Sequence, residues 1–333
     1  MRENTERKEE MFLSPYATRS SQTRGRERAE EKCPMRTDFQ RDRDRIIYSK
    51  AFRRLKNKTQ VFFSPEGDHY RTRLTHTLDV SQVARSIARG LDLNEDLAEA
   101  IALGHDLGHT PFGHSGEAVL NRLAPLGFEH NKQSLRVVEV LENNGSGLNL
   151  TFEVRDGILN HKKTGNPATL EGQAVSIADR IAYINHDIED AKSAGLLKDE
   201  DLPAETALLG SNSRERINTM ITSIWRNSAG KGFVAMEDDV LHATEVLRDF
   251  MFKNVYLTPE AKGEEERADM MLTTMYEYFL KKVDALPDIY KKLLDRFSLE
   301  TVVCDYISSM TDRYAVYVFE SLFIPKNFLI SRE

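Results

Sequence analysis

The sequence predicts an all-α fold, with at most a short β-hairpin near residues 59–72. Apolar residues recur at helical spacing through most of the 333 residues, which is the pattern of amphipathic helices. Glycine and proline are scarce, at 18 and 10 residues, and they stand mainly between the periodic stretches. No repeat period or low-complexity tract interrupts the pattern. These observations together favour a bundle of helices.

The elements can be justified in chain order. Residues 1–45 form a charged arm that we expect to be partly ordered, because turn-forming residues break any long pattern. A helix with a basic outer face is predicted over residues 45–58, and an extended segment over 59–63 leads into a Ser-Pro-Glu-Gly turn. The remaining helices are predicted at residues 79–91, 95–107, 134–141, 170–194, 238–256, 264–283, 288–297 and 299–323.

This pattern divides the chain into three parts. We expect the arm to be followed by a core over residues 46–200 and by a C-terminal helical part over 201–333, which would pack on that core and contribute to oligomerisation. The apolar helix at 299–323 is a candidate for a subunit interface and equally for a core helix.

Composition excludes several classes of protein. A hydrophobic fraction of 40%, a charged fraction of 30% and a net charge of −7 are typical of a soluble globular protein. No run approaches the roughly 18 apolar residues of a membrane helix. The charged first ten residues lack the apolar region of a secretory signal. The two cysteines, Cys33 and Cys304, cannot make a disulfide framework, so we expect a cytoplasmic protein.

The charge is unevenly distributed along the chain. Residues 1–75 carry a net charge of +7, most of it over residues 46–75, and the remaining residues are acidic overall. A concentration of positive charge predicts an anionic partner. The alternative is that this end of the chain folds over an acidic body. The basic stretch over residues 46–75 directly precedes His76.

Histidines predict a metal site. Three of the nine lie in the motif HDLGHTPFGHSGE at residues 105–117. His105 and Asp106, adjacent at the end of an apolar helix, can offer an imidazole and a carboxylate to one cation. His76 can supply a third ligand. Asp179 can supply a fourth, because a carboxylate in an otherwise apolar helix needs a partner.

The helix that carries Asp179 has a polar face. Asp179, Tyr183 and Asp187 follow one another at intervals of four residues and therefore line one side of a helix, as the wall of a polar cleft would. The alternative is that Asp187 pairs with Arg180 or Lys192 on the surface. Taken singly, His69, His161 and His242 are each typical of a histidine that packs in the core or caps a helix.

Four motifs resemble a known family. The pattern of His76, His105-Asp106 and Asp179 resembles the HD superfamily of metal-dependent phosphohydrolases. The resemblance is closer to the bacterial deoxyguanosinetriphosphate triphosphohydrolase-like proteins and spans residues 40–320. Ser309 departs from it, because the family pattern has glycine there. The motifs are FRRLKNKTQVF (52–62), GDHYRTRLTHT (67–77), HDLGHTPFGHSGE (105–117) and DYISSMTDRYA (305–315).

The resemblance implies a fold and a reaction. The fold would be an HD-superfamily helical bundle with additional C-terminal helices. The reaction would be hydrolysis of dGTP or several deoxynucleoside triphosphates to deoxynucleoside and inorganic triphosphate. His76, His105, Asp106 and Asp179 would bind Mn, Fe, Mg, Ni or Zn, since a ligand set without thiolate does not choose among them.

The resemblance also implies roles for further side chains. The deoxynucleoside is a poor leaving group, so a general acid is needed, and His114 is the candidate, with Glu117 orienting it. The opposite role, in which His114 aligns the attacking water, stays open. His130 would act with them on the phosphates, and His109 would contact phosphate or support the ligands. Arg73 and Arg180 would bind phosphate, and Gln60, Tyr183 and Asp187 would bind the sugar.

Other functions stay open. One is an HD-type phosphodiesterase or nucleotidase that acts on another nucleotide. A second is a regulatory oligomer that binds nucleotide or nucleic acid, although no basic face with interleaved aromatic residues supports nucleic acid. A third is a silent scaffold, although no metal ligand is lost. The family resemblance implies a homo-oligomer and allows a nucleotide effector, and the sequence predicts no membrane partner.

Overall fold

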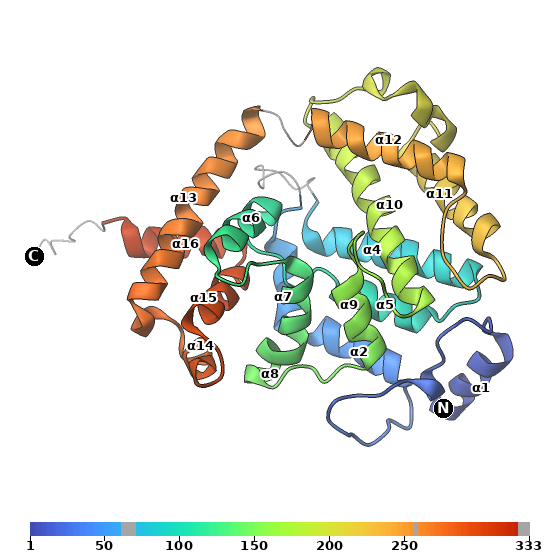
Figure 1. Cartoon of the computed structure of the whole chain (residues 1–333), viewed down its shortest axis with the longest axis horizontal. Coiled ribbons are helices and arrows are strands. Elements are labelled where there is room, and N and C mark those ends of the chain that lie inside the picture. Colours follow the sequence, from blue (N-terminus) through green and yellow to red (C-terminus); the bar gives the residue numbers. More distant parts are fainter. Residues whose placement is uncertain (61–70, 256–258, 326–333) are drawn as a thin grey trace, which may run out of the picture.

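The computed structural model describes residues 1–60, 71–255 and 259–325. Within these ranges the all-α prediction is confirmed, since helices joined by loops account for the architecture (Figure 1). The predicted hairpin is represented by an isolated antiparallel bridge between Thr59 and Thr72, and residues 61–70 between them lie outside the described residues. None of the described helices is long and apolar enough to cross a membrane.

The helices follow one another closely along the chain. Their bounds in the first half are α1 Arg2–Phe12, α2 Asp38–Tyr48, α3 Lys50–Arg54, α4 Arg73–Gly90, α5 Glu95–Gly104, α6 Gly113–Leu123, α7 His130–Arg136, α8 Glu142–Gly145 and α9 Phe152–Asn160. In the second half they are α10 Leu170–Ser193, α11 Ser213–Ser228, α12 Asp238–Asn254, α13 Pro259–Lys281, α14 Asp288–Lys291, α15 Leu299–Ser308 and α16 Asp312–Phe323.

Two hydrophobic clusters hold the molecule together. The larger one surrounds α4, α5 and α10, which pack on one another, and it extends to α2, α9, α11 and α12. Its members Val80, Ile101 and Ile181 have no exposed surface. The smaller cluster joins α13, α15 and α16 with Val119 and Leu120 of α6. Figure 1 shows the same two groups of helices, with α6 and α7 between them.

Several predicted boundaries differ from the observed ones for local reasons. The predicted helix at 79–91 begins earlier, at Arg73, because Thr72 and Thr75 form a reciprocal capping box. The predicted helix at 45–58 is two α-helices and a 3₁₀ turn, since Ser49 caps a new helix with its hydroxyl. The predicted helix at 170–194 is confirmed as α10.

The prediction of one continuous helix over 299–323 is wrong, because the structure has two helices there. α15 ends at Ser308, and α16 begins at Asp312 because the side chain of Thr311 accepts a hydrogen bond from the amide of Tyr314. Ser309, which stands where glycine was expected, has a φ of −74° and needs no left-handed conformation. Val302 and Val303 of α15 are fully buried, so this half belongs to the core. α16 keeps an exposed outer face with Tyr314 and Tyr317.

Buried carboxylates attach the N-terminal arm to the body. Glu171 of α10 accepts hydrogen bonds from the backbone amide and hydroxyl of Thr18, each at 2.9 Å. Glu153 of α9 binds the hydroxyl of Thr23 and the amide of Arg24, both at 2.7 Å. These contacts join residues 18–24 of the arm to α9 and α10.

Candidate functional site

Four side chains from three parts of the chain converge between α4, α5 and α10. His76 lies on α4, His105 and Asp106 directly follow α5, and Asp179 lies on α10. His76 Nε2 lies 3.1 Å from Asp179 Oδ1 and 3.8 Å from Asp106 Oδ2. His105 Nε2 lies 3.5 Å from Asp106 Oδ1 and 3.8 Å from Asp179 Oδ1. The structure thus brings together all four side chains that the sequence predicted as metal ligands.

The chemistry of this cluster fits a divalent metal ion. His105 Nε2 is buried and has no hydrogen-bond partner among the described residues. A buried polar atom without a partner is costly, and a cation at this position would use the nitrogen lone pair. His76, His105 and Asp106 are buried, with ligand atoms within 4.8 Å of one another. The Asp179 side chain keeps 21% exposure, which leaves solvent access on one side of the cluster.

Neighbouring side chains keep both carboxylates ionised. Burial favours the neutral form of Asp106, but His109, His105 and Arg73 outweigh it and hold its pKa well below the usual range. Burial likewise opposes ionisation of Asp179, and a hydrogen bond with His76 together with nearby histidines lowers its pKa. Ionised carboxylates are the form that ligates a metal.

A buried arginine lies beside the cluster. Arg73, at the start of α4, is 2% exposed, and its Nη1 donates a hydrogen bond of 2.8 Å to Asp106 Oδ2. Its Nε and Nη2 atoms are buried and have no partner among the described residues, and the same holds for Oε1 of Gln60. Unused donors of a guanidinium at a metal cluster are suited to an anionic ligand such as phosphate.

The loop after α5 and the start of α6 add a group of histidines. The imidazole of His109 lies 3.1 Å from Asp106 and stacks on the ring of His130, with centroids 4.0 Å apart. Glu117 accepts hydrogen bonds from the amide of His130 at 3.0 Å and from its Nδ1 at 2.8 Å. The Nδ1 atom of His114 lies 3.6 Å from the same carboxylate. The sequence paired Glu117 with His114, whereas the structure shows that His114 and His130 share it.

The environment of Glu117 fixes its charge. Burial opposes ionisation, but hydrogen bonds from His114 and His130 outweigh it and hold the pKa of Glu117 well below its usual range. The His114 side chain is 79% exposed, so it can reach a ligand, whereas His130 is buried. An anionic Glu117 can thus accept a hydrogen bond from either imidazole.

α10 presents the predicted polar face. Asp187 is 2% exposed, which excludes its alternative as a surface ion pair. Tyr183 is half-buried, and burial together with the charge of Asp179 raises its pKa. Nη1 of Arg180 lies 4.0 Å from Oε1 of Glu245 on α12. The face therefore runs from the metal-ligand cluster along α10, with Arg180 turned towards α12.

Sequence reasoning missed two residues at the site. His161, which the sequence alone suggests as a core or capping histidine, is buried. Its Nε2 lies 3.3 Å from His130 Nε2, and its ring centroid lies 5.0 Å from that of His105. Burial lowers the pKa of His161 to about 4, so it is neutral at pH 7. His186 lies 3.2 Å from Asp79, and its ring is perpendicular to that of His76, with centroids 6.0 Å apart. No motif marks either residue, because only the packing of α9 and α10 brings them near the cluster.

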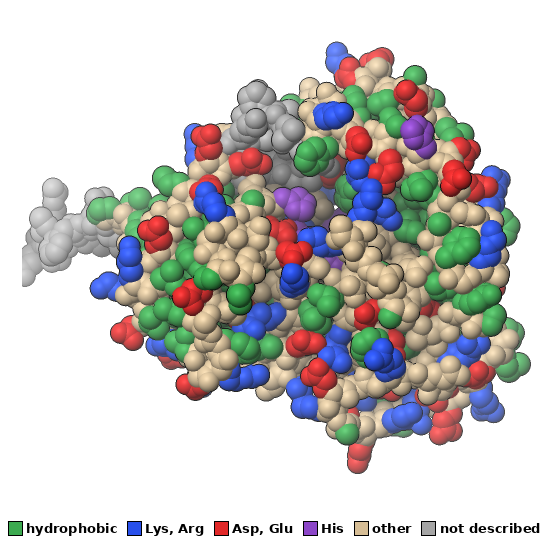
Figure 2. All heavy atoms as spheres, viewed as in Figure 1, with side chains coloured by type: hydrophobic (Ala, Val, Ile, Leu, Met, Phe, Trp, Pro, Cys, Tyr) green, Lys and Arg blue, Asp and Glu red, His purple; other side chains and the backbone are tan. Residues whose placement is uncertain are grey.

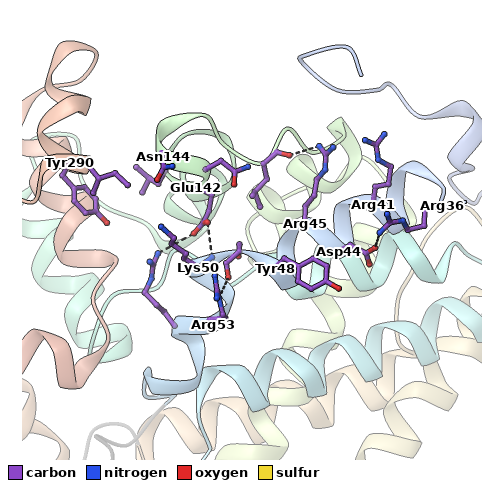
Figure 3. A pocket seen from close by; sticks show the side chains of 16 residues that line it. Arg36, Arg41, Asp44, Arg45, Tyr48, Lys50, Arg53, Glu142, Asn144 and Tyr290 are labelled. Atoms are coloured by element: carbon purple, nitrogen blue, oxygen red, sulfur yellow. Dashed lines mark hydrogen bonds and ion pairs between the residues drawn. The ribbon is translucent and has the colours of Figure 1, made fainter. Parts of the chain in front are cut away.

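A separate basic pocket lies between α2, α3, α8 and α14 (Figure 3). It has a volume of about 650 Å³, and its lining includes Arg45, Lys50 and Arg53 together with Glu142 and Tyr290. No side chain of the metal-ligand cluster lines it. In the space-filling view, histidine reaches the surface elsewhere, between the two groups of helices and among acidic and basic side chains (Figure 2).

The close approach of two backbone segments predicts the effect of a mutation. A Cβ at Gly108 would lie 2.1 Å from the backbone nitrogen of Ser134 and 2.6 Å from the carbonyl oxygen of His130. Gly108→Ala should therefore lower the free energy of unfolding by about 1–3 kcal/mol or more, measured by chemical denaturation, because the loop and α7 must separate. Gly263→Ala, with open space around its Cβ, is the control and should leave stability unchanged or raise it. Equal stability of the two variants would contradict the prediction.

Comparisons with known proteins place the chain in a family. The HD domain matches residues 73–184, and the phosphohydrolase-associated domain matches residues 234–321. A deoxyguanosinetriphosphate triphosphohydrolase-like protein of Caldanaerobacter subterraneus is 59% identical, over 98% of this chain and 96% of its own. A protein of the same name from Desulfatibacillum aliphaticivorans is 46% identical, over 98% of each chain.

A solved phosphohydrolase from Bacteroides thetaiotaomicron shares the fold. Its TM-score is 0.54 at 18% identity, and the match covers 84% of this chain and 67% of that one. The fold, the buried His/Asp cluster and the full-length relatives agree on one family of hydrolases. The chain belongs to the deoxyguanosinetriphosphate triphosphohydrolase-like family of HD-domain phosphohydrolases.

Proposed function

We propose that this phosphohydrolase converts deoxynucleoside triphosphates to deoxynucleoside and inorganic triphosphate with the help of a divalent metal ion. The observation that carries the proposal is Arg73, a buried guanidinium that is tied to Asp106 through one nitrogen and has further donors unused among the described residues. A cation in this position, next to a metal-ligand cluster, is suited to hold the phosphates of a substrate.

The metal would be held by His76, His105, Asp106 and Asp179. When bound there, it polarises a phosphoryl oxygen and acidifies a water. Its identity among Mn, Fe, Mg, Ni and Zn stays open, because imidazole and carboxylate ligands accept all of them. Asp106 has a second role, because its contacts with Arg73 and His109 tie the phosphate-binding groups to the cluster.

The imidazoles near Glu117 would move the proton. Expulsion of the 5′ oxygen of the nucleoside requires a proton, and His114 is exposed enough to deliver it there. Glu117 and the stacked pair of His109 and His130 would hold this imidazole beside the α-phosphate. The opposite role, in which His114 aligns the attacking water, uses the same contacts.

The remaining predicted residues would bind phosphate and sugar. Arg73 and Arg180 would face the triphosphate. Gln60 and Asp187 would hold the sugar, with Asp187 accepting a hydrogen bond from the 3′-hydroxyl. The ring of Tyr183, packed against C2′, would exclude a 2′-hydroxyl, because a buried hydroxyl without a partner is unfavourable.

Homo-oligomers are a further part of the proposal. The exposed outer face of α16, with Tyr314 and Tyr317, is the candidate for an interface, and a nucleotide effector is compatible with it. Light scattering of the purified protein measures the oligomeric state directly.

A product assay tests the proposed reaction. The four dNTPs and GTP are incubated with the protein and each metal in turn, and chromatography separates triphosphate from pyrophosphate. We expect deoxynucleoside and triphosphate, with dGTP turned over faster than GTP. Release of dNMP and pyrophosphate would contradict the proposal and favour a different phosphohydrolase, and equal turnover of GTP and dGTP would remove the proposed role of Tyr183.

Loss of one ligand charge should empty the metal site. Asp179→Asn keeps the shape of the side chain but removes the anion, so we expect bound metal, measured by mass spectrometry of the dialysed protein, to fall to near zero together with turnover. Asp190→Asn, on the same helix but outside the cluster, should retain both. Full metal content in Asp179→Asn would remove this residue from the ligand set.

Loss of the imidazole should separate chemistry from metal binding. His114→Asn should keep the metal and lower kcat by about 10²–10⁴-fold, because general acid–base catalysis contributes this much. His242→Asn removes an exposed histidine of α12 and should leave kcat unchanged. A wild-type rate in His114→Asn would exclude it from the mechanism.

A further inference from the structure

One carboxylate of the C-terminal part joins two segments of the site. Asp312 is the first residue of α16 and is 8% exposed. Its Oδ2 accepts hydrogen bonds from the backbone amide of Thr59, at 2.8 Å, and from the hydroxyl of the same residue. Its Oδ1 accepts a hydrogen bond of 3.0 Å from the backbone amide of Phe112. Thr59 directly precedes Gln60, and Phe112 lies two residues before His114.

The second of these segments needs support from outside. Phe112 has a φ of +61°, and Gly113 after it has a φ of +57°. A left-handed conformation is unfavourable for a residue with a Cβ and is retained only where the surroundings enforce it. Phe112 is also the N-cap of α6, and its side chain accepts no hydrogen bond from the first turn of the helix. The bond from its own amide to Asp312 therefore holds the turn from which α6, with His114 and Glu117, begins.

A buried lysine makes a second tie at the same place. Lys58 is 2% exposed, and its Nζ donates hydrogen bonds to the carbonyl oxygen of His109 and, at 2.7 Å, to that of Ser308. Ser308 ends α15, four residues before Asp312. The junction of α15 and α16 thus binds two segments of the chain. Asp312 binds Thr59 and Phe112, and Lys58 joins Ser308 to His109.

We propose that Asp312 is a positioning residue of the active centre, which sets Gln60 and His114 relative to the metal-ligand cluster. The inference rests on the proposed function of these two residues. It assigns to the C-terminal part a role in turnover in addition to packing. The four proposed metal ligands lie on α4, after α5 and on α10, whereas the hydrogen bonds of Asp312 go to Thr59 and Phe112. Loss of its carboxylate should therefore affect turnover while metal binding persists.

The chain offers a matched control. Asp305, on α15, is a fully buried carboxylate that binds Arg136 at 2.7 Å and Gln133 at 2.9 Å. Like Asp312 it lies in the motif at 305–315, but its contacts are with α7 and not with residues 58–60 or 109–114. Asp305→Asn therefore removes a buried charge nearby without touching the two segments that Asp312 holds.

The test compares Asp312→Asn, Asp305→Asn, Thr59→Val and Thr59→Ser with the wild type. Asparagine keeps one acceptor oxygen, but its NH₂ group would then face the amide and hydroxyl of Thr59, which both donate hydrogen bonds to Asp312. We expect kcat to fall by about 10²-fold in Asp312→Asn, as displacements near 1 Å can cause, with full metal content and a smaller change of KM. Thr59→Val should lower kcat and Thr59→Ser, which keeps the hydroxyl, should restore it. Thermal unfolding of every variant separates these changes from loss of folding.

The outcomes distinguish this inference from the proposed reaction. A panel of dNTPs, nucleoside monophosphates and cyclic nucleotides first identifies the phosphate ester that the wild type hydrolyses, and turnover of every variant is then measured on that ester. A substrate other than a dNTP would refute the proposed reaction, but it would still test the role of Asp312. If no ester is hydrolysed, the histidine side-chain NMR signals are compared, and the His114 signal should move in Asp312→Asn but not in Asp305→Asn. The inference would be overturned if Asp312→Asn and Asp305→Asn had the same rate. It would also be overturned if the His114 signal did not move in Asp312→Asn.

Discussion

The need to keep a buried carboxylate ionised governs the architecture of the site. Asp106 is 3% exposed, and an isolated anion at such a position would lose several kcal/mol of hydration free energy. Arg73 from α4 and His109 from the loop after α5 offset that cost, at 2.8 Å and 3.1 Å. Because these partners come from different segments, satisfying Asp106 requires α4, the end of α5 and the following loop to meet. The same contacts place His76 and His105 around one point.

Two kinds of support surround this centre. The packing of α4, α5 and α10 is apolar and local to the HD domain, and it sets the four side chains of the cluster. The loop at 109–114 is instead held by polar contacts with the junction of α15 and α16, through Lys58 and Asp312. α6 joins the two, since Val119 and Leu120 belong to the hydrophobic cluster of the C-terminal helices. The phosphohydrolase-associated part therefore contributes to the geometry of the site as well as to packing.

Much of the fold could be predicted from periodicity, and the errors share one cause. α10 was predicted within one residue because fifteen of its residues are buried, which leaves a strong apolar pattern. The break between α15 and α16 was missed, because Met310 follows Ile307 at helical spacing and only the hydroxyl of Thr311 marks a new start. At the site, His161 could not be predicted, since its place beside His105 and His130 depends on how α9 packs. Short-range patterns carry no information on such contacts.

The sequence by itself determined the helical class, the family and the side chains available for metal binding, because periodicity and the motif at 105–117 are properties of neighbouring residues. Only the tertiary structure decided which partners the polar side chains of the site contact and which of them are buried. Glu117 lies closer to the imidazole of His130 than to that of His114, Asp187 is buried, and Asp312 binds Phe112 and Thr59, which lie 200 and 253 positions away. The physical reason is that a charged or polar side chain takes its state from the partners around it, and folding brings those partners from distant segments.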